Sequence, residues 1–135
     1  MIYLDNAATS YKKPDCVLHA TCRAMYENSA NPGRSGHDLS MHASEILYDT
    51  RKSLAKLLNV DNPERITFCQ NTTEALNKGI KGIMANGGHI ITSSMEHNSV
   101  IRPIMALKER GVTHSILRGN ERGELDVERL EKMIR

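Results

Sequence analysis

Long apolar runs and an excess of charge of one sign are both missing from this sequence. No run of about 18 apolar residues occurs, which argues against a transmembrane helix. The first ten residues, MIYLDNAATS, lack the basic start and the apolar stretch of a secretory signal. Lysine and arginine total 18 against 16 acidic residues, for a net charge of +2, and they are scattered. We therefore expect a cytoplasmic protein with neither nucleic acid nor a membrane as partner.

Cysteine is scarce, and its spacing carries no metal or disulfide pattern. The three cysteines, Cys16, Cys22 and Cys69, form no Cys-x-x-Cys pair and have no histidine at zinc-finger spacing. Their odd number argues against a disulfide framework, so a reducing compartment fits best and no metal site is expected. We interpret all three as small buried apolar residues.

Turn residues and apolar periodicity divide the chain into two parts. With 135 residues the chain is one domain by size. We expect an N-terminal segment with helices over residues 1–63. Pro14 can open its first helix, and residues 39–58 keep helical spacing until Asp61, Asn62 and Pro63 end the pattern.

From residue 64 to residue 135, short apolar runs alternate with helical patterns. In chain order the segments are RITFC, TEALNKGIKGIM, HIITS, NSVIRPIMALKER, VTHSIL and VERLEKMIR. This βαβαβα order predicts an α/β fold with a mostly parallel sheet and helical crossovers. The last segment reaches Arg135 without a C-cap, so we expect a truncated version of a longer arrangement.

A polar group, Asn71 to Glu74, stands between the first apolar run and a helical pattern. Asn71 with Glu74 three residues later matches a capping box, which by itself accounts for the group. A helix start after a strand also offers free backbone N–H groups and the positive end of a dipole to an anion. The hydroxyls of Thr72 and Thr73 would add donors. From these residues alone both interpretations stand, and capping is favoured over phosphate binding.

His97 lies in SMEHNSV, at the end of the next strand-like run. Ligands of open α/β sheets bind at the carboxyl ends of the strands, so we expect His97 to face the same crevice as Thr73. A lone histidine in a loop is more often a surface residue, and that alternative stays open.

Two further segments are weaker candidates. NPGRSGH, residues 31–37, carries Arg34 and His37, and its composition favours a plain connecting loop. YLDNAAT, residues 3–9, places Ala7 and Ala8 inside a polar segment, which suggests that the backbone approaches another group closely. The residues themselves do not identify that group.

Taken together, four segments resemble the class V aminotransferase family of pyridoxal 5'-phosphate (PLP) enzymes, and within it the cysteine desulfurases. The four are YLDNAAT, NPGRSGH, RITFCQNTTEALN and SMEHNSV, in the family's order and at familiar separations. The resemblance runs over all 135 residues but covers only the N-terminal portion of a family member. It implies a partial three-layer sandwich, the N-terminal part of the PLP-binding large domain of a fold-type-I PLP-dependent transferase, over residues 64–135.

The resemblance implies a cofactor-binding role for three residues. Thr72 and Thr73 match the family's phosphate-binding turn at a helix start, in addition to any capping role. His97 matches the histidine that stacks on the pyridine ring of PLP and assists proton transfer, which makes it the candidate catalytic residue.

Three other residues match the substrate side of the family's pocket. Ala7 and Ala8 match the N-terminal segment that lines it, and His37 matches a histidine near its entrance. The aspartate that pairs the pyridine nitrogen, the arginine that holds the substrate carboxylate and the cysteine that accepts sulfur all come later in family members.

The family's Schiff-base lysine follows a Ser-x-His motif, and none of the eight lysines here follows a histidine. Such a lysine must be placed and desolvated before its amine can react with the cofactor. We therefore expect this chain to supply the phosphate cradle and the stacking histidine, and expect the isolated chain to be inactive.

For the complete enzyme the resemblance implies conversion of L-cysteine to L-alanine, with sulfur passed to an enzyme cysteine as a persulfide. It also implies a homodimer and a sulfur-acceptor protein as partners. Two alternatives stay open: another class V aminotransferase or selenocysteine lyase activity, and a non-catalytic phosphate-binding α/β module if these 135 residues are the whole product.

Overall fold

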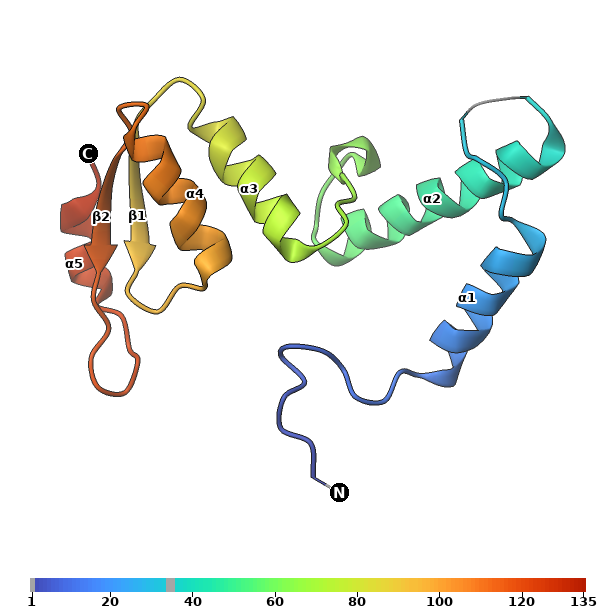
Figure 1. The fold of residues 1–135 in the computed structure, drawn as a ribbon, viewed down its shortest axis with the longest axis horizontal. Coiled ribbons are helices and arrows are strands. Elements are labelled where there is room, and N and C mark those ends of the chain that lie inside the picture. The colour runs from blue at the N-terminus through green and yellow to red at the C-terminus, as the bar shows by residue number, and fades with distance from the viewer. Residues whose placement is uncertain (1, 34–35) are drawn as a thin grey trace. The chain divides into compact units, whose positions relative to one another are not determined.

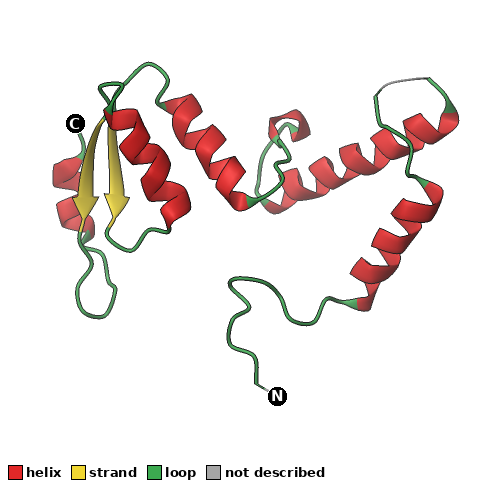
Figure 2. Cartoon of the chain, in the orientation of Figure 1, coloured by secondary structure: helices red, strands yellow, loops and turns green. Residues whose placement is uncertain are grey.

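The computed structural model of the chain describes residues 2–33 and 36–135. The chain divides into two compact units, residues 1–67 and residues 68–135 (Figures 1 and 2). Two members of the NPGRSGH segment, Arg34 and Ser35, lie outside the described residues. The expectation that the PLP-binding portion begins at residue 64 stays a prediction.

The first unit consists of helices and connecting segments. Helix α1 spans Asp15–Glu27, α2 spans Asp38–Leu57 and a short 3-10 helix, η1, spans Pro63–Arg65. Helix α1 has no buried residue, whereas α2 buries Ser40, Ala43 and Ala55. The Ser40 hydroxyl donates to the carbonyl of Asn31 at 2.9 Å, which ties the connecting segment to the start of α2.

Helix α2 ends in a Schellman motif. Asn59 adopts a left-handed conformation with φ of 53°, which asparagine tolerates better than most residues. The N–H of Val60 donates to the carbonyl of Ala55 at 2.8 Å, and the N–H of Asn59 donates to that of Lys56 at 3.4 Å. The helix predicted over residues 39–58 is thus confirmed, with its end fixed by Asn59 before the expected stop at Asp61.

The second unit is a parallel α/β arrangement. In chain order it contains α3 (Thr72–Ile83), β1 (His89–Ser93), α4 (Asn98–Lys108), β2 (Thr113–Leu117) and α5 (Val127–Met133). Strands β1 and β2 pair in parallel, with His89 opposite Thr113 and Ser93 opposite Leu117. In Figure 1, α3 and α4 lie on one side of the strands and α5 on the other. The predicted α/β class and parallel pairing are confirmed.

The core of the second unit lies between β2 and α4. Ile104 and Leu107 of α4 are buried, as are Val112, just before β2, and Leu117, its last residue. Helix α3 packs against α4. These contacts hold α4 against β2 and α3 against α4, and so fix where the first turns of both helices lie.

The strand predicted at RITFC, residues 65–69, is wrong. Among the described residues the sheet has two strands, β1 and β2, and Arg65 closes η1 instead. Ile66 is extended, with φ of −88° and ψ of 114°, but a strand also needs a hydrogen-bonded neighbour. The carbonyl of Ile66 accepts from the Nε of Arg51 on α2 at 3.1 Å. The apolar pattern therefore produced extended backbone without a ladder.

The cysteines are free, and their predicted burial is wrong for two of them. Cys16 and Cys22 are exposed on α1, a helix with no buried residue, and Cys69 is half-buried. Over the described residues, no helix is both long and apolar enough to cross a membrane.

Candidate functional site

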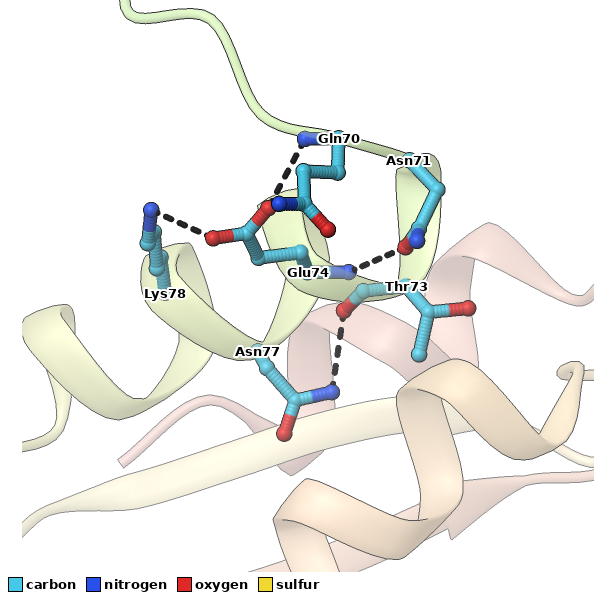
Figure 3. Close-up of polar contacts among 6 residues, drawn as sticks. All are labelled: Gln70, Asn71, Thr73, Glu74, Asn77 and Lys78. Carbon is cyan, nitrogen blue, oxygen red and sulfur yellow. Dashed lines mark hydrogen bonds and ion pairs between the residues drawn. The ribbon is translucent and has the colours of Figure 1, made fainter.

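The first turn of α3 begins at Asn71, which is the N-cap (Figure 3). Its backbone is extended, with φ of −160° and ψ of 170°. Its side-chain Oδ1 accepts a hydrogen bond from the N–H of Glu74 at 2.9 Å. The Asn71 carbonyl accepts the first helical bond, from Ala75 at 3.1 Å. The capping interpretation of this residue is confirmed.

Glu74 completes a variant of the capping box. Its Oε2 accepts from the backbone N–H of Gln70 at 2.8 Å, one residue before the N-cap. Its Oε1 lies 2.7 Å from the Nζ of Lys78, one turn along the helix. These contacts, the Lys78 hydrogen bond first and the Gln70 N–H second, lower the pKa of the Glu74 carboxyl. The negative charge of Glu74 is therefore stabilised and offset at this helix start.

Two backbone donors remain at the start of α3. Oδ1 of Asn71 accepts from the N–H of Glu74, the third residue of the helix. The N–H groups of Thr72 and Thr73 have no acceptor within the described part of the chain. Both threonines are exposed. Figure 3 shows the side chain of Thr73 directed away from Lys78 and from the Glu74 carboxylate. The arrangement offers two N–H groups, two hydroxyls and a positive dipole end to an anion.

His97 is the N-cap of α4. Its Nδ1 accepts a hydrogen bond from the backbone N–H of Ser99 at 3.1 Å, and the Ser99 hydroxyl lies 2.9 Å from the same nitrogen. Because Nδ1 acts as an acceptor, the neutral ring carries its proton on Nε2. The residue is exposed, so Nε2 and the ring faces are accessible.

The first turns of α3 and α4 lie at the same end of the second unit. The two helices pack side by side, and both begin at the end where β1 and β2 finish (Figure 1). Thr72, Thr73 and His97 therefore gather at the carboxyl end of the parallel strands, where α/β proteins bind ligands. The geometry expected for these three residues is present.

Contacts that the sequence pattern did not indicate fix the segment before His97. Ser94 donates its backbone N–H to the Leu117 carbonyl at 2.9 Å, and its hydroxyl accepts from the N–H of Gly119 at 3.2 Å. The hydroxyl of Ser93 donates to the Glu96 carboxylate at 2.7 Å. Two consecutive serines, the last residue of β1 and the residue after it, were the available signal, since such hydroxyls often bond to nearby backbone.

The other three predicted residues belong to the first unit. Ala8 donates its N–H to the Asp5 carbonyl at 3.1 Å in a turn that includes Ala7, and both alanines are exposed. His37 is the N-cap of α2, where its Nδ1 accepts from the N–H of Ser40 at 3.2 Å. Their assignment to the substrate side stays a prediction.

Both predicted histidines thus share a capping role that sequence reasoning missed. In each case a serine two or three residues later donates its N–H to the ring, Ser99 for His97 and Ser40 for His37. Histidine is not among the residues preferred at this position, so the pattern gave little warning. Throughout residues 2–33 and 36–135, no cluster of three or more His, Cys, Asp or Glu residues could hold a metal ion.

Comparisons with known proteins identify the family. The model of the family described as aminotransferase class-V matches residues 2–135, so the chain belongs to that family, whose members use PLP. A protein of Synechocystis sp. named probable cysteine desulfurase is 33% identical to this chain. The match covers 99% of this chain and 33% of that protein. This chain thus spans about a third of the length of the curated relatives it matches.

Solved structures support the same grouping. The apo structure of a cysteine desulfurase from Thermococcus onnurineus NA1 matches 97% of this chain and 33% of its own, with a TM-score of 0.87 and 32% identity. A protein named SspA, solved in complex with cysteine, matches 90% of this chain and 36% of its own, with a TM-score of 0.81 and 27% identity. The predicted likeness to part of a fold-type-I large domain is thereby confirmed.

Proposed function

We propose that this chain forms part of the cofactor site of a PLP-dependent cysteine desulfurase. Thr72 and Thr73 hold the cofactor phosphate, and His97 stacks on its pyridine ring and moves protons. The observation that carries the proposal is the shared position of two unused N–H groups and an accessible imidazole at one end of the second unit.

The donor set at α3 fits a phosphate group. A phosphate needs several donors and a site of positive potential, and the N–H groups of Thr72 and Thr73 supply both. A carboxylate so close would oppose an anion, but Glu74 pairs with Lys78 and takes the N–H of Gln70. The first turn of α3 can therefore accept negative charge without removing its own cap.

The hydrogen bonds of His97 suit a residue that handles protons. The N–H of Ser99 holds Nδ1 in its acceptor form and fixes the orientation of the ring. Nε2 is then left to exchange a proton with a neighbouring group, and the ring face is left for stacking. The hydrogen bonds of Ser94 with Leu117 and Gly119 hold the segment before His97 in place.

When bound, PLP supplies an electron sink for the carbanion formed from an amino-acid substrate. This chain contributes binding and orientation, since none of its lysines follows a histidine as the family's anchoring lysine does. We therefore expect the chain alone to hold the cofactor without a covalent bond, and weakly, because a half-built pocket stays open to water.

For the whole protein we propose the desulfurase reaction, in which the C–S bond of L-cysteine breaks, sulfur passes to an enzyme cysteine and L-alanine leaves. The names of the relatives support this choice over a transaminase or selenocysteine lyase. The cysteine bound to SspA supports the choice of substrate. The homodimer, the sulfur-acceptor protein and the cytoplasmic location stay predictions.

Amide chemical shifts of the chain, titrated separately with PLP and with pyridoxal, test the proposal. We expect the amides of Thr72 and Thr73 to shift with PLP and far less with pyridoxal, and the His97 ring resonances to shift with both. The matched variant Thr50→Ala, on an exposed face of α2, should bind as the unaltered chain does. Equal chemical-shift changes of the Thr72 and Thr73 amides with PLP and with pyridoxal would show that these residues do not bind the phosphate.

A non-catalytic phosphate-binding module is distinguished by the same titration. Such a module would respond to inorganic phosphate as strongly as to PLP and would leave the His97 ring unaffected. The specific observation in its favour is that no lysine of the chain follows a histidine.

A further inference from the structure

Nδ1 of His97 has two hydrogen-bonding neighbours, and both belong to Ser99. The backbone N–H of Ser99 donates to this nitrogen at 3.1 Å, and the Ser99 hydroxyl oxygen lies 2.9 Å from it. A backbone N–H can only donate, whereas a hydroxyl donates or accepts because its proton rotates about the C–O bond. The two neighbours therefore constrain the ring nitrogen in different ways.

The Ser99 hydroxyl is committed to the ring of His97. Ser99 is buried, with 8% of its surface exposed. Among the described residues, its hydroxyl has no hydrogen-bond partner besides Nδ1. Because a buried polar group left without a partner is costly, the hydroxyl and the ring hold each other in place.

The cap of α2 provides an internal comparison. Nδ1 of His37 accepts from the backbone N–H of Ser40 at 3.2 Å, but the Ser40 hydroxyl donates to the carbonyl of Asn31 at 2.9 Å. His37 and His97 are both exposed, and each is the N-cap of its helix. The serine hydroxyl is thus directed to the ring nitrogen at His97 and away from it at His37.

Proton exchange at Nε2 of a histidine requires a proton on Nδ1. A neutral ring with its proton on Nε2 cannot accept a second proton there, and releasing that one would leave an anion. When Nδ1 holds a proton, Nε2 can take one up to form the imidazolium cation and release it again. Nδ1 must then donate, and the backbone N–H of Ser99, which also donates, opposes it.

Charged groups around His97 are engaged with other partners. No ion pair of the described residues includes His97. The carboxylate of Glu96, next in sequence, accepts from the Ser93 hydroxyl at 2.7 Å. On α3, which packs against α4, Glu74 and Lys78 pair with each other at 2.7 Å. The one titratable side chain of β2 is a histidine at its second position, nearer the opposite end of the strand. Ser99 is therefore the residue positioned to respond to a proton on Nδ1.

We propose that the Ser99 hydroxyl lets Nδ1 of His97 change from acceptor to donor without the ring leaving the start of α4. In the neutral ring of the structure, the hydroxyl donates to Nδ1 beside the backbone N–H. When Nδ1 takes up a proton from water, the hydroxyl rotates and its oxygen accepts that proton in a hydrogen bond. Nε2 then exchanges its own proton while the ring stays in place. Ser99 is thus a positioning residue, and this inference rests on the proton-transfer role proposed for His97.

Nuclear magnetic resonance of the ring nitrogens, in the chain without PLP, tests the proposal. Nitrogen chemical shifts report which ring nitrogens carry protons, and exchange of the Nδ1 proton with water reports whether it is hydrogen-bonded. Once both nitrogens are protonated at acid pH, the Nδ1 proton of His97 should exchange at least about tenfold more slowly than that of His37. Equal exchange rates at the two rings would overturn the proposal.

Three variants separate the hydroxyl from the rest of Ser99. Ser99→Ala keeps the backbone N–H and removes the hydroxyl, so the Nδ1 proton of His97 should exchange as fast as that of His37. Ser99→Thr keeps a hydroxyl and should restore slow exchange. The matched control Ser53→Ala removes a hydroxyl that donates to the Asp49 carbonyl on α2, and should leave the His97 ring unchanged. Slow exchange in Ser99→Ala would overturn the proposal, and this comparison with Ser53→Ala stands even if Ser99→Thr does not fold.

The neutral ring serves as a check on the cap itself. All three variants should keep the proton of the neutral His97 ring on Nε2, because the backbone N–H of residue 99 remains. A change of the neutral tautomer in Ser99→Ala would give the hydroxyl a different role and contradict the proposal.

The outcome is separate from that of the proposed function because these spectra contain no PLP. Fast exchange of the His97 Nδ1 proton would overturn the inference and leave the cofactor role standing. A His97 ring that shows no response to PLP would remove the cofactor role, while slow exchange would still establish the contact of the protonated Nδ1 with the Ser99 hydroxyl.

Discussion

The Nδ1 atom of His97 lies 3.1 Å from the backbone nitrogen of Ser99 and accepts its hydrogen bond at the start of α4. The residue proposed to stack on the cofactor is therefore also the cap of a helix. Loss of activity on replacing it would not by itself demonstrate a catalytic role, because the helix start would be damaged too.

Replacing His97 by alanine and by asparagine separates the two roles. His97→Ala should lower the free energy of unfolding by about 1 kcal/mol, since the Ser99 N–H loses its acceptor. His97→Asn should restore most of that stability, because asparagine caps helices well, but it has no ring to stack on PLP. Urea unfolding and PLP titration of both variants make the measurement. If His97→Asn binds PLP as the unaltered chain does, ring stacking plays no part.

Asn71 offers a comparable test at the other helix. Asn71→Ala removes the acceptor of the Glu74 N–H and should cost about 1 kcal/mol of unfolding free energy. Asn71→Asp keeps a capping oxygen and adds a negative charge beside Thr72, so stability should hold while affinity for phosphate falls. Urea unfolding with phosphate titration compares them. Unchanged phosphate affinity in Asn71→Asp would place the anion elsewhere.

Strong local patterns were enough to predict most elements of the second unit. The run HIITS coincides with β1, and the turn glycines after α3 and α4 adopt positive φ, as at Gly87 and Gly111. The capping interpretation of Asn71 rested on contacts within four residues, which sequence spacing records directly. Local chemistry therefore fixed these features.

Features that depend on a distant partner were not predictable. RITFC has the composition of a strand, yet a strand exists only where a second backbone supplies hydrogen bonds. The 2.9 Å bond from Ser94 to the Leu117 carbonyl joins residues 23 positions apart in sequence, and no spacing rule indicates it. The resemblance located Thr72, Thr73 and His97, whereas the capping role of His97 became visible only in the structure.

The contacts of Glu74 predict a dependence of stability on pH. Its pKa is lowered from the ordinary value of 4.5, mainly by the hydrogen bond to Lys78 and then by the N–H of Gln70. A carboxyl with a depressed pKa stabilises the fold above its unfolded pKa, and this contribution disappears as pH falls through the folded value. Unfolding free energy should therefore decrease below pH 4.5, and the decrease should be smaller in Glu74→Gln.

The Glu74–Lys78 ion pair also predicts how the free energy of unfolding changes at alkaline pH. The pKa of Lys78 is raised above 10.5, chiefly by Glu74, so the stabilisation persists through neutral pH and is lost as pH rises through that folded value. Both groups are at the surface, so added salt should reduce the effect. Urea midpoints measured at several pH values, at low and high salt, provide the check. If Glu74→Gln loses as much stability at acid pH as the unaltered chain does, that loss comes from other carboxyl groups.

Proline at position 72 provides the sharpest test of the phosphate cradle. Thr72 is the first residue of α3, where proline is well tolerated because its missing N–H has no helical acceptor. The extended backbone of Asn71, with ψ of 170°, also suits a residue that precedes proline. Thr72→Pro should thus keep the fold while removing one N–H donor and one hydroxyl, and Thr72→Ala removes the hydroxyl alone.

Loss of one charge-assisted hydrogen bond should weaken PLP and phosphate binding about tenfold further in Thr72→Pro than in Thr72→Ala. Titration of both variants, with circular dichroism to confirm equal helix content, makes the comparison. Equal affinities of the two folded variants would show that the N–H of residue 72 does not bind the phosphate.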